Sequence, residues 1–589
     1  MTSLNRKLAR DLWHTRGQAF AIAMVMDCGV ATFVMSLATL ASLTQARDAY
    51  YDRYRFSHIF AHLVRAPDAL ADRIRAIPGV AQVQTRVSQA VLLDVPGLSE
   101  PAVGRLLSIP DRRQPMLNEL HLRRGRYIEP GRRTEVIASE GFANAHKLSP
   151  GDTITAILNG RKQSLTVVGV ALSPEFIFSL REGELVPDDK RFGVFWMGDA
   201  ELSAAFNMDG AFNDVTLSLM RGASEPEVIR QLDDLIAPYG GVGAYGRYDQ
   251  VSHRYLSEEI AGLKIMGTYV PLIFLAVAAV LLNVVISRLV THQREQVAAL
   301  KAFGYTKWEI GWHYLKYVLL IVVIGSIAGT FFGAWLGRGL TAMYTQLYRF
   351  PVFTFFAPAA VIAGGLLVSA LAGVLGTFKA VRKAVALAPA EAMRPEPPAD
   401  FKPTIVERLG LQRLFSQPAR MVLRQLERRP IKSALSSLGI AMAVSVLVVG
   451  RFSYDAIDYL QEFQFSVVQR QDLSVSLVEA SSPEVLYSFR KLPGVLDSEP
   501  YRAVPVRLRH GHLERRTAIL GLQPQPQLFR VMNWDATLVP LPPDGLVISD
   551  KLAELLDVQA GETLRVEVME GRRPVLELPV VGLLKDLAG

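Results

Sequence analysis

Residues 265–287 read IMGTYVPLIFLAVAAVLLNVVIS, an uncharged apolar run that decides the class of protein. A helix needs about 20 consecutive apolar residues to cross the hydrocarbon core of a bilayer. Four further runs of this kind lie within residues 19–43, 317–337, 350–378 and 433–450. Asp27 is the one charged residue inside the first of them. The sequence therefore predicts an α-helical transmembrane protein with five spans.

The composition agrees with a membrane protein and excludes several other classes. Half of the 589 residues are hydrophobic, and the net charge of +8 is too dilute to indicate nucleic-acid binding. A single cysteine, Cys28, excludes an intrachain disulfide and an all-cysteine metal site. The sequence holds no G-x-x-x-x-G-K-[ST] phosphate loop. We expect a protein that is not an enzyme, with no catalytic residue, metal or cofactor of its own.

Basic residues orient the spans. They precede the first span, separate the second from the third, follow the fourth and precede the fifth: Arg6, Lys7, Arg10 and Arg16; Arg288, Arg294, Lys301 and Lys307; Lys379, Arg382 and Lys383; Arg420, Arg424, Arg428, Arg429 and Lys432. The positive-inside rule makes these clusters and the N-terminus cytoplasmic, and residues 44–263 and 456–589 extracytoplasmic. A cleaved signal peptide is the alternative for the first span, but its apolar run exceeds the ~7–15 residues of a signal core.

Short matches recur in the same order at offsets of 410–415 residues. They pair Leu8–Leu12 with Val422–Leu426, Ile77–Val80 with Leu492–Val495, Val136–Ala138 with Val547–Ser549, Gly151–Thr153 with Gly561–Thr563, and Val168-Gly169 with Val581-Gly582. The pattern predicts a duplication. Its second copy would be incomplete, with the counterpart of the loop after the second span expected near residue 710. A degenerate second half is the alternative.

The segment 44–263 is typical of a mixed α+β domain. Ser164–Val170 is a β-prone run, and Asn159-Gly160 is a turn signal. Asp68–Ile77 is predicted to be a short amphipathic helix that Pro78-Gly79 ends, and Glu484–Leu492 repeats it. We expect residues 211–220 to supply strands beside the counterparts of 564–568 and 576–581.

Two histidine pairs do not predict a metal site. His58 and His62 have the spacing of helical ligands, but Phe56–Val64 has strand character. Strand residues four apart are ~13 Å from each other, too far to share one ion. His510-Gly-His512 is predicted to be a turn or strand surface.

The loop after the second span predicts a short helix joined tightly to the third span. Gln293–Phe303 places Arg294, Glu295 and Lys301 on one side, and Val297, Leu300 and Phe303 on another. Gly304 stands where a left-handed helix end is needed, and Thr306-Lys-Trp-Glu309 has the capping-box pattern. An ordinary solvated connection is the alternative.

These residues resemble a known family. Arg294-Glu-x-x-x-x-Leu-Lys-Ala-x-Gly304, with Tyr305 and Trp308 after it, looks like the coupling loop of the FtsX/MacB-like ABC transporter permeases. Glu135–Glu140, Gly151-Asp152 and Val167–Val170 are similar to the family's inserted periplasmic domain, and the order of spans is the family's. The resemblance implies ATPase-coupling roles for Arg294, Glu295, Leu300, Lys301, Phe303, Gly304, Tyr305 and Trp308.

The resemblance also implies a layout of two FtsX-like repeats, the second incomplete. We expect a helix and first span at 1–43; an extracytoplasmic α+β domain at 44–263; three spans at 264–384, with the coupling loop at 289–312; a cytoplasmic linker and amphipathic helix at 385–432; a fifth span at 433–455; and a second, incomplete extracytoplasmic domain at 456–589. The protein would lie in the bacterial inner membrane.

The implied function is the permease subunit of an ABC transporter. A MacB/LolD-like cytoplasmic ATPase dimer would drive its outer domains to export or extract a lipid, lipoprotein, peptide or hydrophobic compound. Membrane lipids, and for transport a periplasmic membrane-fusion adaptor, are the other partners, with no nucleic acid. The alternatives are a mechanical regulator of an extracytoplasmic hydrolase and a membrane-anchored sensor.

Asp27 is a separate candidate because a charge inside a span costs ~2.5–3.5 kcal/mol on insertion scales. We expect it either to pair with a polar group such as Asn283 in another span, or to lie near a wet surface.

Overall fold

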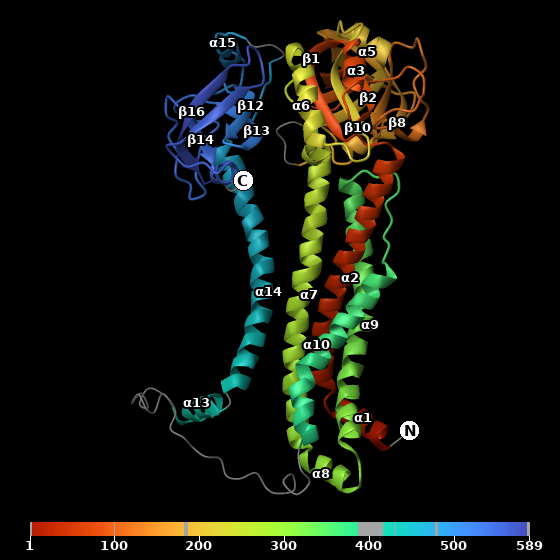
Figure 1. Cartoon of the computed structure of the whole chain (residues 1–589), viewed down its shortest axis with the longest axis vertical. Coiled ribbons are helices and arrows are strands. Elements are labelled where there is room, and N and C mark those ends of the chain that lie inside the picture. Colours follow the sequence, from red (N-terminus) through yellow and green to blue (C-terminus); the bar gives the residue numbers. More distant parts are fainter. Residues whose placement is uncertain are drawn as a thin grey trace. The chain divides into compact units, whose positions relative to one another are not determined.

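The computed structural model describes residues 3–98, 101–181, 186–386, 416–428, 430–477 and 481–585 (Figure 1). The chain forms two compact units, one of residues 1–51 with 255–450 and one of residues 52–254 with 451–589. The linker expected from residue 385 lies mostly outside the described residues, which resume at 416.

The first unit is helical. Its elements are α1 (Ser3–His14), α2 (Arg16–Arg53), α7 (Val251–His292), α8 (Arg294–Ala302), α9 (Lys307–Leu347), α10 (Ala359–Ala386), α13 (Gln417–Arg428) and α14 (Pro430–Glu462). α2, α7 and α14 each extend into the second unit, which also holds the π-helical turn at Phe463–Val468 that follows α14. Among the described residues, five helices are long and apolar enough to cross a membrane, namely α2, α7, α9, α10 and α14 with that turn. The expectation of five membrane-spanning helices is confirmed at this level.

Two of the spanning helices are longer than expected. α2 continues to Arg53, beyond the boundary predicted at residue 43, and α7 begins at Val251, before the boundary at 264. Residues 44–53 contain neither glycine nor proline, so nothing in the chain ends the helix where its apolar run ends. The helices therefore extend beyond the segments that the apolar runs define.

A row of glycines brings α9 against α2. A Cβ atom on Gly325, Gly329 or Gly333 would lie 2.7 Å from the carbonyl oxygen of Ala23, Asp27 or Ala31, respectively. Small residues at four-residue spacing allow such close backbone approach between membrane helices. The spacing is visible in the sequence at 325–333, but its partner helix is not.

The second unit holds two sheets before α7. The first has the order β11-β1-β10-β2, with β1 (Ile59–Pro67), β2 (Val80–Arg86), β10 (Ala211–Leu219) and β11 (Tyr245–Gly246). The helices α3 (Leu70–Arg75) and α6 (Glu225–Ile236) contribute to its core. Val228, Leu232 and Ile236 of α6 are buried at the spacing of one helix face.

The other sheet closes on itself. Its elements are β3 (Ser88–Asp94), β4 (Ala102–Ile109), β5 (His121–Gly125), β6 (Glu135–Ser139), β7 (Thr153–Leu158), β8 (Arg161–Leu172) and β9 (Phe192–Gly198). The order is β5-β8-β6-β9-β4-β3-β7, and β7 also pairs with β8. Six strands therefore form a ring, to which β5 is added. The short helices α4 (Glu140–Ala145) and α5 (Asp199–Ala205) follow β6 and β9.

Residues 481–585 form a five-stranded sheet of order β13-β12-β15-β16-β14. Its elements are α15 (Val485–Arg490), β12 (Arg502–His510), β13 (Leu513–Gly521), β14 (Leu546–Ser549), α16 (Asp550–Leu556), β15 (Thr563–Val568) and β16 (Val575–Leu584). The predicted helices at 68–77 and 484–492 are confirmed as α3 and α15, each shorter than predicted. Gly511, with φ of 57°, turns the chain between β12 and β13, as predicted for His510-Gly-His512.

One expectation about strands is wrong. Residues 211–219 form β10, which pairs with β1 and β2 rather than with β7 or β8. β15 and β16 also pair with each other and have a further neighbour on each outer side. The alternation of apolar residues in 211–219 predicts a strand but carries no information about its partner, because pairing depends on distant segments.

Candidate functional site

The candidate site is the junction of α8 with α9. α8 ends at Ala302, and Gly304 has a φ of 91°, as predicted. The Gly304 N–H donates to the Lys301 carbonyl, and the Tyr305 N–H donates to the Leu300 carbonyl, each over 3.1 Å. This pair of bonds is the Schellman arrangement that closes a helix end.

α9 begins immediately after that turn. The Glu309 N–H donates to Oγ1 of Thr306 over 3.2 Å, and the Thr306 N–H donates to Oε2 of Glu309 over 2.8 Å. The predicted capping box is confirmed. Only Phe303, Gly304, Tyr305 and Thr306 separate the two helices, and their backbone is held at both ends.

The aromatic residues of this junction face outward. The side chains of Phe303 and Trp308 are 84% and 78% exposed, whereas Val297 and Ala298 are buried in the helical core. The sequence predicted Phe303 on the same face as Val297, and that prediction is wrong. Phe303 is the C-cap residue of α8, so it lies where the helical periodicity that buries Val297 stops.

The remaining predicted residues divide between the core and the surface. Leu300 and Tyr305 are half-buried and pack against the helical core. Lys301 donates from Nζ to the Val385 carbonyl at the end of α10 over 2.8 Å. Arg294 is half-buried and Glu295 is exposed in the first turn of α8. The exposed surface of the junction is thus aromatic and charged, and the residues beneath it are apolar.

A polar cluster that the sequence did not predict holds α8 to the rest of the helical unit. Oδ1 of Asp11 in α1 accepts a hydrogen bond from Nε2 of Gln293 over 2.8 Å. Oδ2 of Asp11 lies 2.8 Å from Nζ of Lys7 and 3.8 Å from Nε2 of His313. The Tyr314 hydroxyl donates to Oε1 of Gln293 over 3.1 Å. The cluster thus joins α1, α9 and the residue just before α8.

The electrostatics of this cluster favour an ionised Asp11. Burial raises the pKa of the Asp11 carboxyl, but bonds from His313, Lys7 and Gln293 outweigh it and hold the pKa below its ordinary value. Asp11 therefore acts as a charged acceptor, which makes its hydrogen bonds stronger than those between neutral groups.

The two polar candidates within the spans are not hydrogen-bonded to each other in the described structure. Oδ1 of Asp27 is buried without a hydrogen-bond partner among the described residues. Asn283 lies half-buried in α7. The backbone of Asp27 faces Gly329 across the contact of α2 with α9.

A buried ion cluster lies at the sheet formed by β11, β1, β10 and β2. Nε of Arg86 at the end of β2 donates to Oδ1 of Asp214 in β10. Nη1 of Arg86 donates to Oε2 of Glu175 over 2.7 Å, and Nδ2 of Asn118 donates to the same oxygen over 3.0 Å. Burial raises the pKa of Asp214, but Arg86 and His62 outweigh it and hold that pKa well below its usual range. We interpret this cluster as structural.

His62 of β1 and His58, the residue before that strand, have protein partners. Nδ1 of His62 lies 2.5 Å from Oδ2 of Asp214, and Nδ1 of His58 accepts from the Leu219 N–H over 3.2 Å. The strand β10, rather than the other histidine, thus provides a partner for each of these two residues.

Comparison with known proteins identifies the segment that contains the junction. Residues 269–386, from within α7 to the end of α10, match the family model FtsX-like permease C-terminal. An uncharacterized ABC transporter permease protein of Mycobacterium tuberculosis is 22% identical over 267 residues, which are 44% of this chain and 29% of that protein. The chain thus spans less than a third of the length of this relative.

Solved structures of extracytoplasmic domains are similar to part of the chain. The extracellular domain of the noncanonic ABC-type transporter YknZ from Gram-positive bacteria is 17% identical, and the match covers 30% of this chain and 93% of that one, with a TM-score of 0.20. The periplasmic region of MacB from Actinobacillus actinomycetemcomitans is 11% identical, with coverage of 35% and 92% and a TM-score of 0.22.

Proposed function

We propose that this chain is a membrane permease of the FtsX-like ABC transporter family and that it converts ATP hydrolysis by a partner ATPase into movement of its outer domains. Permeases of this family have an ATPase partner and are generally not enzymes themselves. The observation that carries the proposal is the junction of α8 and α9, where Phe303 and Trp308 are exposed beside a helix turn with little conformational freedom.

The junction has the properties that a docking element needs. Exposed aromatic side chains are favoured at the centre of protein interfaces. The Schellman turn and the capping box limit rotation between α8 and α9, so a displacement of α8 is passed to α9. α9 is one continuous helix to Leu347, and its glycine row contacts the α2 backbone. We propose that α9 and α2 transmit the displacement together.

The partner we propose is a cytoplasmic ATPase dimer of the MacB/LolD type that binds Phe303, Trp308 and the charged residues of α8. This assignment places the N-terminus and the α8 junction in the cytoplasm, and the protein in the bacterial inner membrane. A periplasmic membrane-fusion adaptor is a further partner if the protein exports its cargo.

The cargo we propose is a lipid, a lipoprotein, a peptide or a hydrophobic compound. The second candidate is a mechanical regulator that transmits the state of the ATPase to an extracytoplasmic hydrolase. The same junction serves both, because both need a displacement to cross the membrane. A gene for an adaptor beside that of this chain supports transport, whereas one for a cell-wall hydrolase supports regulation.

We also propose that the two outer domains derive from one duplicated unit. β3 pairs with β4 and with β7, and β12 pairs in the same directions with β13 and with β15. β8 pairs with β7 and with β6, and β16 pairs in the same directions with β15 and with β14. The turns before β7 and β15 agree as well. Gly151 and Gly561 have φ of 107° and 98°, and each donates an N–H bond of 2.7 Å, to the carbonyls of Val167 and Val580.

The test is ATP hydrolysis in proteoliposomes that contain the full chain and its candidate ATPase. We expect no hydrolysis by the chain alone and stimulation of the ATPase by the wild-type chain. Phe303→Ala with Trp308→Ala should abolish the stimulation. Trp335→Ala is the matched control, because Trp335 is 61% exposed on the same helix away from the junction. Equal stimulation by the double variant and the control would contradict docking at α8.

A further inference from the structure

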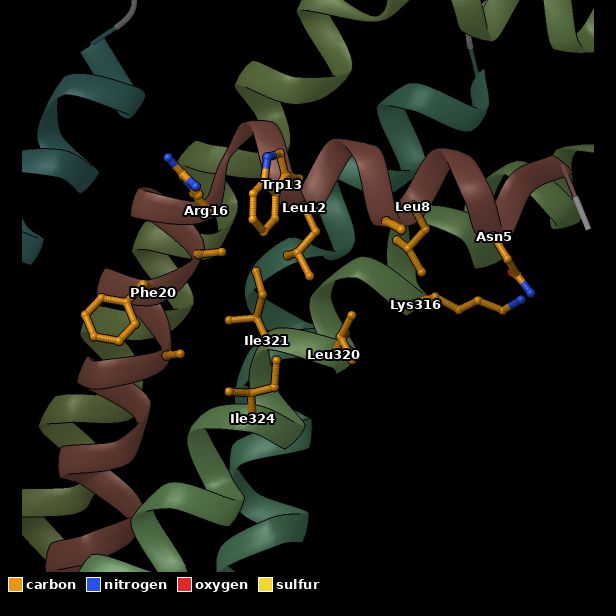
Figure 2. A pocket seen from close by; sticks show the side chains of 13 residues that line it. Asn5, Leu8, Leu12, Trp13, Arg16, Phe20, Lys316, Leu320, Ile321 and Ile324 are labelled. Carbon is orange, nitrogen blue, oxygen red and sulfur yellow. The ribbon is translucent and has the colours of Figure 1, made fainter. Parts of the chain in front are cut away.

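A groove lies between α1 and the adjoining parts of α2 and α9 (Figure 2). Its volume is about 780 Å³, within the ~300–1,000 Å³ of small-molecule sites. All of its lining residues belong to the helical unit, and most are apolar: Leu8, Ala9, Leu12, Ala19, Phe20, Ala23, Leu320, Ile321 and Ile324, with Asn5, Trp13, Arg16 and Lys316.

α1 presents one face to this groove and is fixed by another. Asn5, Leu8, Ala9, Leu12 and Trp13 are spaced as one stripe of a helix, and all line the groove. Asp11 lies outside that stripe and binds Gln293. The hydrogen bonds of Asp11 thus hold α1 in place, while its apolar stripe remains open.

Two cations lie at the groove. Arg16 and Lys316 line it from α2 and α9, and neither has a carboxylate partner within the described part of the chain. The guanidinium carbon of Arg16 is 4.9 Å from the centre of the Trp13 ring, and Nζ of Lys316 is 6.0 Å from that of Trp312. Figure 2 shows Arg16 at the Trp13 end of the groove and the Lys316 side chain extending toward Asn5.

The groove also lies where a spanning helix leaves the bilayer. Phe20 and Ile324, at its deeper end, are 66% and 49% exposed and belong to spanning helices. α1 is amphipathic and ends at His14, two residues before α2 begins. Amphipathic helices of this kind lie at the boundary of headgroups and acyl chains. An apolar cavity with cations at this depth is complementary to a lipid with a negative headgroup.

We propose that this groove binds an anionic diacyl phospholipid of the adjacent leaflet. The acyl chains lie along Leu8, Leu12 and Ile321, and the negative charge of the headgroup is attracted by Arg16 at one end of the groove and by Lys316 at the other. The bound lipid covers the apolar face of α1. It thereby stabilises the position of α1, whose Asp11 binds Gln293. The proposal requires a membrane-spanning chain but not an ATPase partner, so it stands or fails separately from the proposed coupling.

The test uses Trp13, which is 69% exposed at the groove, as the reporter of a nearby bromine atom. The full chain is reconstituted in vesicles of phosphatidylcholine and phosphatidylglycerol at one fixed composition. Bromine is carried on the chains of one lipid or of the other. The fluorescence of each protein, minus that of the same protein with Trp13→Phe, gives the contribution of Trp13. We expect stronger quenching with brominated phosphatidylglycerol, with a preference of about fivefold per cation.

Three variants decide where the preference arises. Arg16→Gln with Lys316→Gln should abolish it. Arg10→Gln is the matched control, because Arg10 is exposed on α1 but does not line the groove, and it should leave the preference unchanged. Ala9→Phe keeps both cations and narrows the groove, and it should reduce the preference.

Three results would overturn the proposal. Equal quenching of the wild type by both lipids would mean that only ordinary boundary lipid, without selectivity, lies near Trp13. An equal loss in Arg10→Gln would mean a general attraction to the surface charge. A full preference in Ala9→Phe would mean that the lipid binds outside the groove.

Discussion

Gln293 donates a hydrogen bond of 2.8 Å from Nε2 to Oδ1 of Asp11, 282 residues away in the sequence, and so joins the residue before α8 to α1. Gln293 also accepts from the buried Tyr314 of α9. The position of α8 therefore depends on α1 and α9 as well as on its own turn. This makes Asp11 a residue that positions the candidate docking site without belonging to its surface.

Replacing Asp11 by Ala should lower stability by about 1.5–3 kcal/mol, because the variant loses hydrogen bonds to a charged acceptor. The folded-state pKa of Asp11 lies below its ordinary value of 3.8, so its contribution is present above that value and is lost as the pH falls through the folded-state pKa. Thermal unfolding of wild type and variant should differ equally across about pH 5 to 8. Asp48→Ala is the control, because the Asp48 pair with Arg47 is exposed. Equal losses in the two variants would contradict the role given to Asp11.

Gly304→Val should reduce stimulation of the partner ATPase. With a φ of 91°, this position costs an L-residue about 1–2 kcal/mol, and no neighbouring atom lies within 4 Å of an added Cβ. The effect would therefore come from the backbone of the turn alone. Gly339→Val, in open space within α9, should leave the stimulation intact. The same rate for Gly304→Val and wild type would mean that the geometry of the turn is irrelevant to coupling.

Gly329→Val should destabilise the contact of α9 with α2. An added Cβ would lie 2.7 Å from both the Asp27 carbonyl and the Cβ of Val30, and overpacking of this kind costs about 1–3 kcal/mol. The measurement is the melting temperature in lipid. Gly17→Val in α2 adds the same side chain where nothing lies within 4 Å. A melting temperature no lower than that of the control would show that α9 and α2 can move apart without loss of stability.

Arg86→Met should destabilise the first outer domain by about 3–5 kcal/mol, because two carboxylates would remain buried without their cation. Hydrogen exchange of β2 and β10 in the full chain measures the change. The pKa of Asp214 is held low, so its contribution is present above its ordinary value of 3.8 and is lost as the pH falls below it through the folded-state pKa. Arg75→Met, which removes an exposed pair with Asp72, is the control. Similar exchange in both variants would refute the structural role of the cluster.

Asp27→Leu should raise the melting temperature, because Oδ1 is buried without a hydrogen-bond partner among the described residues, and an unsatisfied buried group costs about 1–3 kcal/mol. Asn283→Leu tests the other polar residue of the spans. A lower melting temperature for Asp27→Leu would indicate that its carboxyl has a stabilising partner, and an additional loss of activity would assign that partner to function.

The parts of the fold that the sequence predicted depend on neighbours in the chain. The turn at Gly304 and the capping box of Thr306 and Glu309 involve residues at most five positions apart. Their requirements for backbone conformation and side-chain oxygens are therefore visible in a short window. The apolar runs are local in the same sense, since length and composition alone define them.

The features that the sequence does not predict depend on contacts between residues that are far apart in the chain. Asp11 is one acidic residue in a basic segment, and nothing near it identifies Gln293 as its partner. The predicted neighbours of β10 are wrong because a strand pattern defines a buried face but not a partner. The sequence places Phe303 on the same side as Val297 and Leu300, because the helical spacing continues in the sequence although the helix ends at Ala302.

The glycine row of α9 has a consequence for permeation. At Gly325, Gly329 and Gly333, no side chain separates the α9 backbone from the carbonyls of α2. A hydrated ion needs a gap of several ångströms, lined by groups that replace its water, and this seam leaves none. Ions, water and cargo are excluded from the path between α2 and α9, so any substrate that this protein moves must pass along another face of the helices.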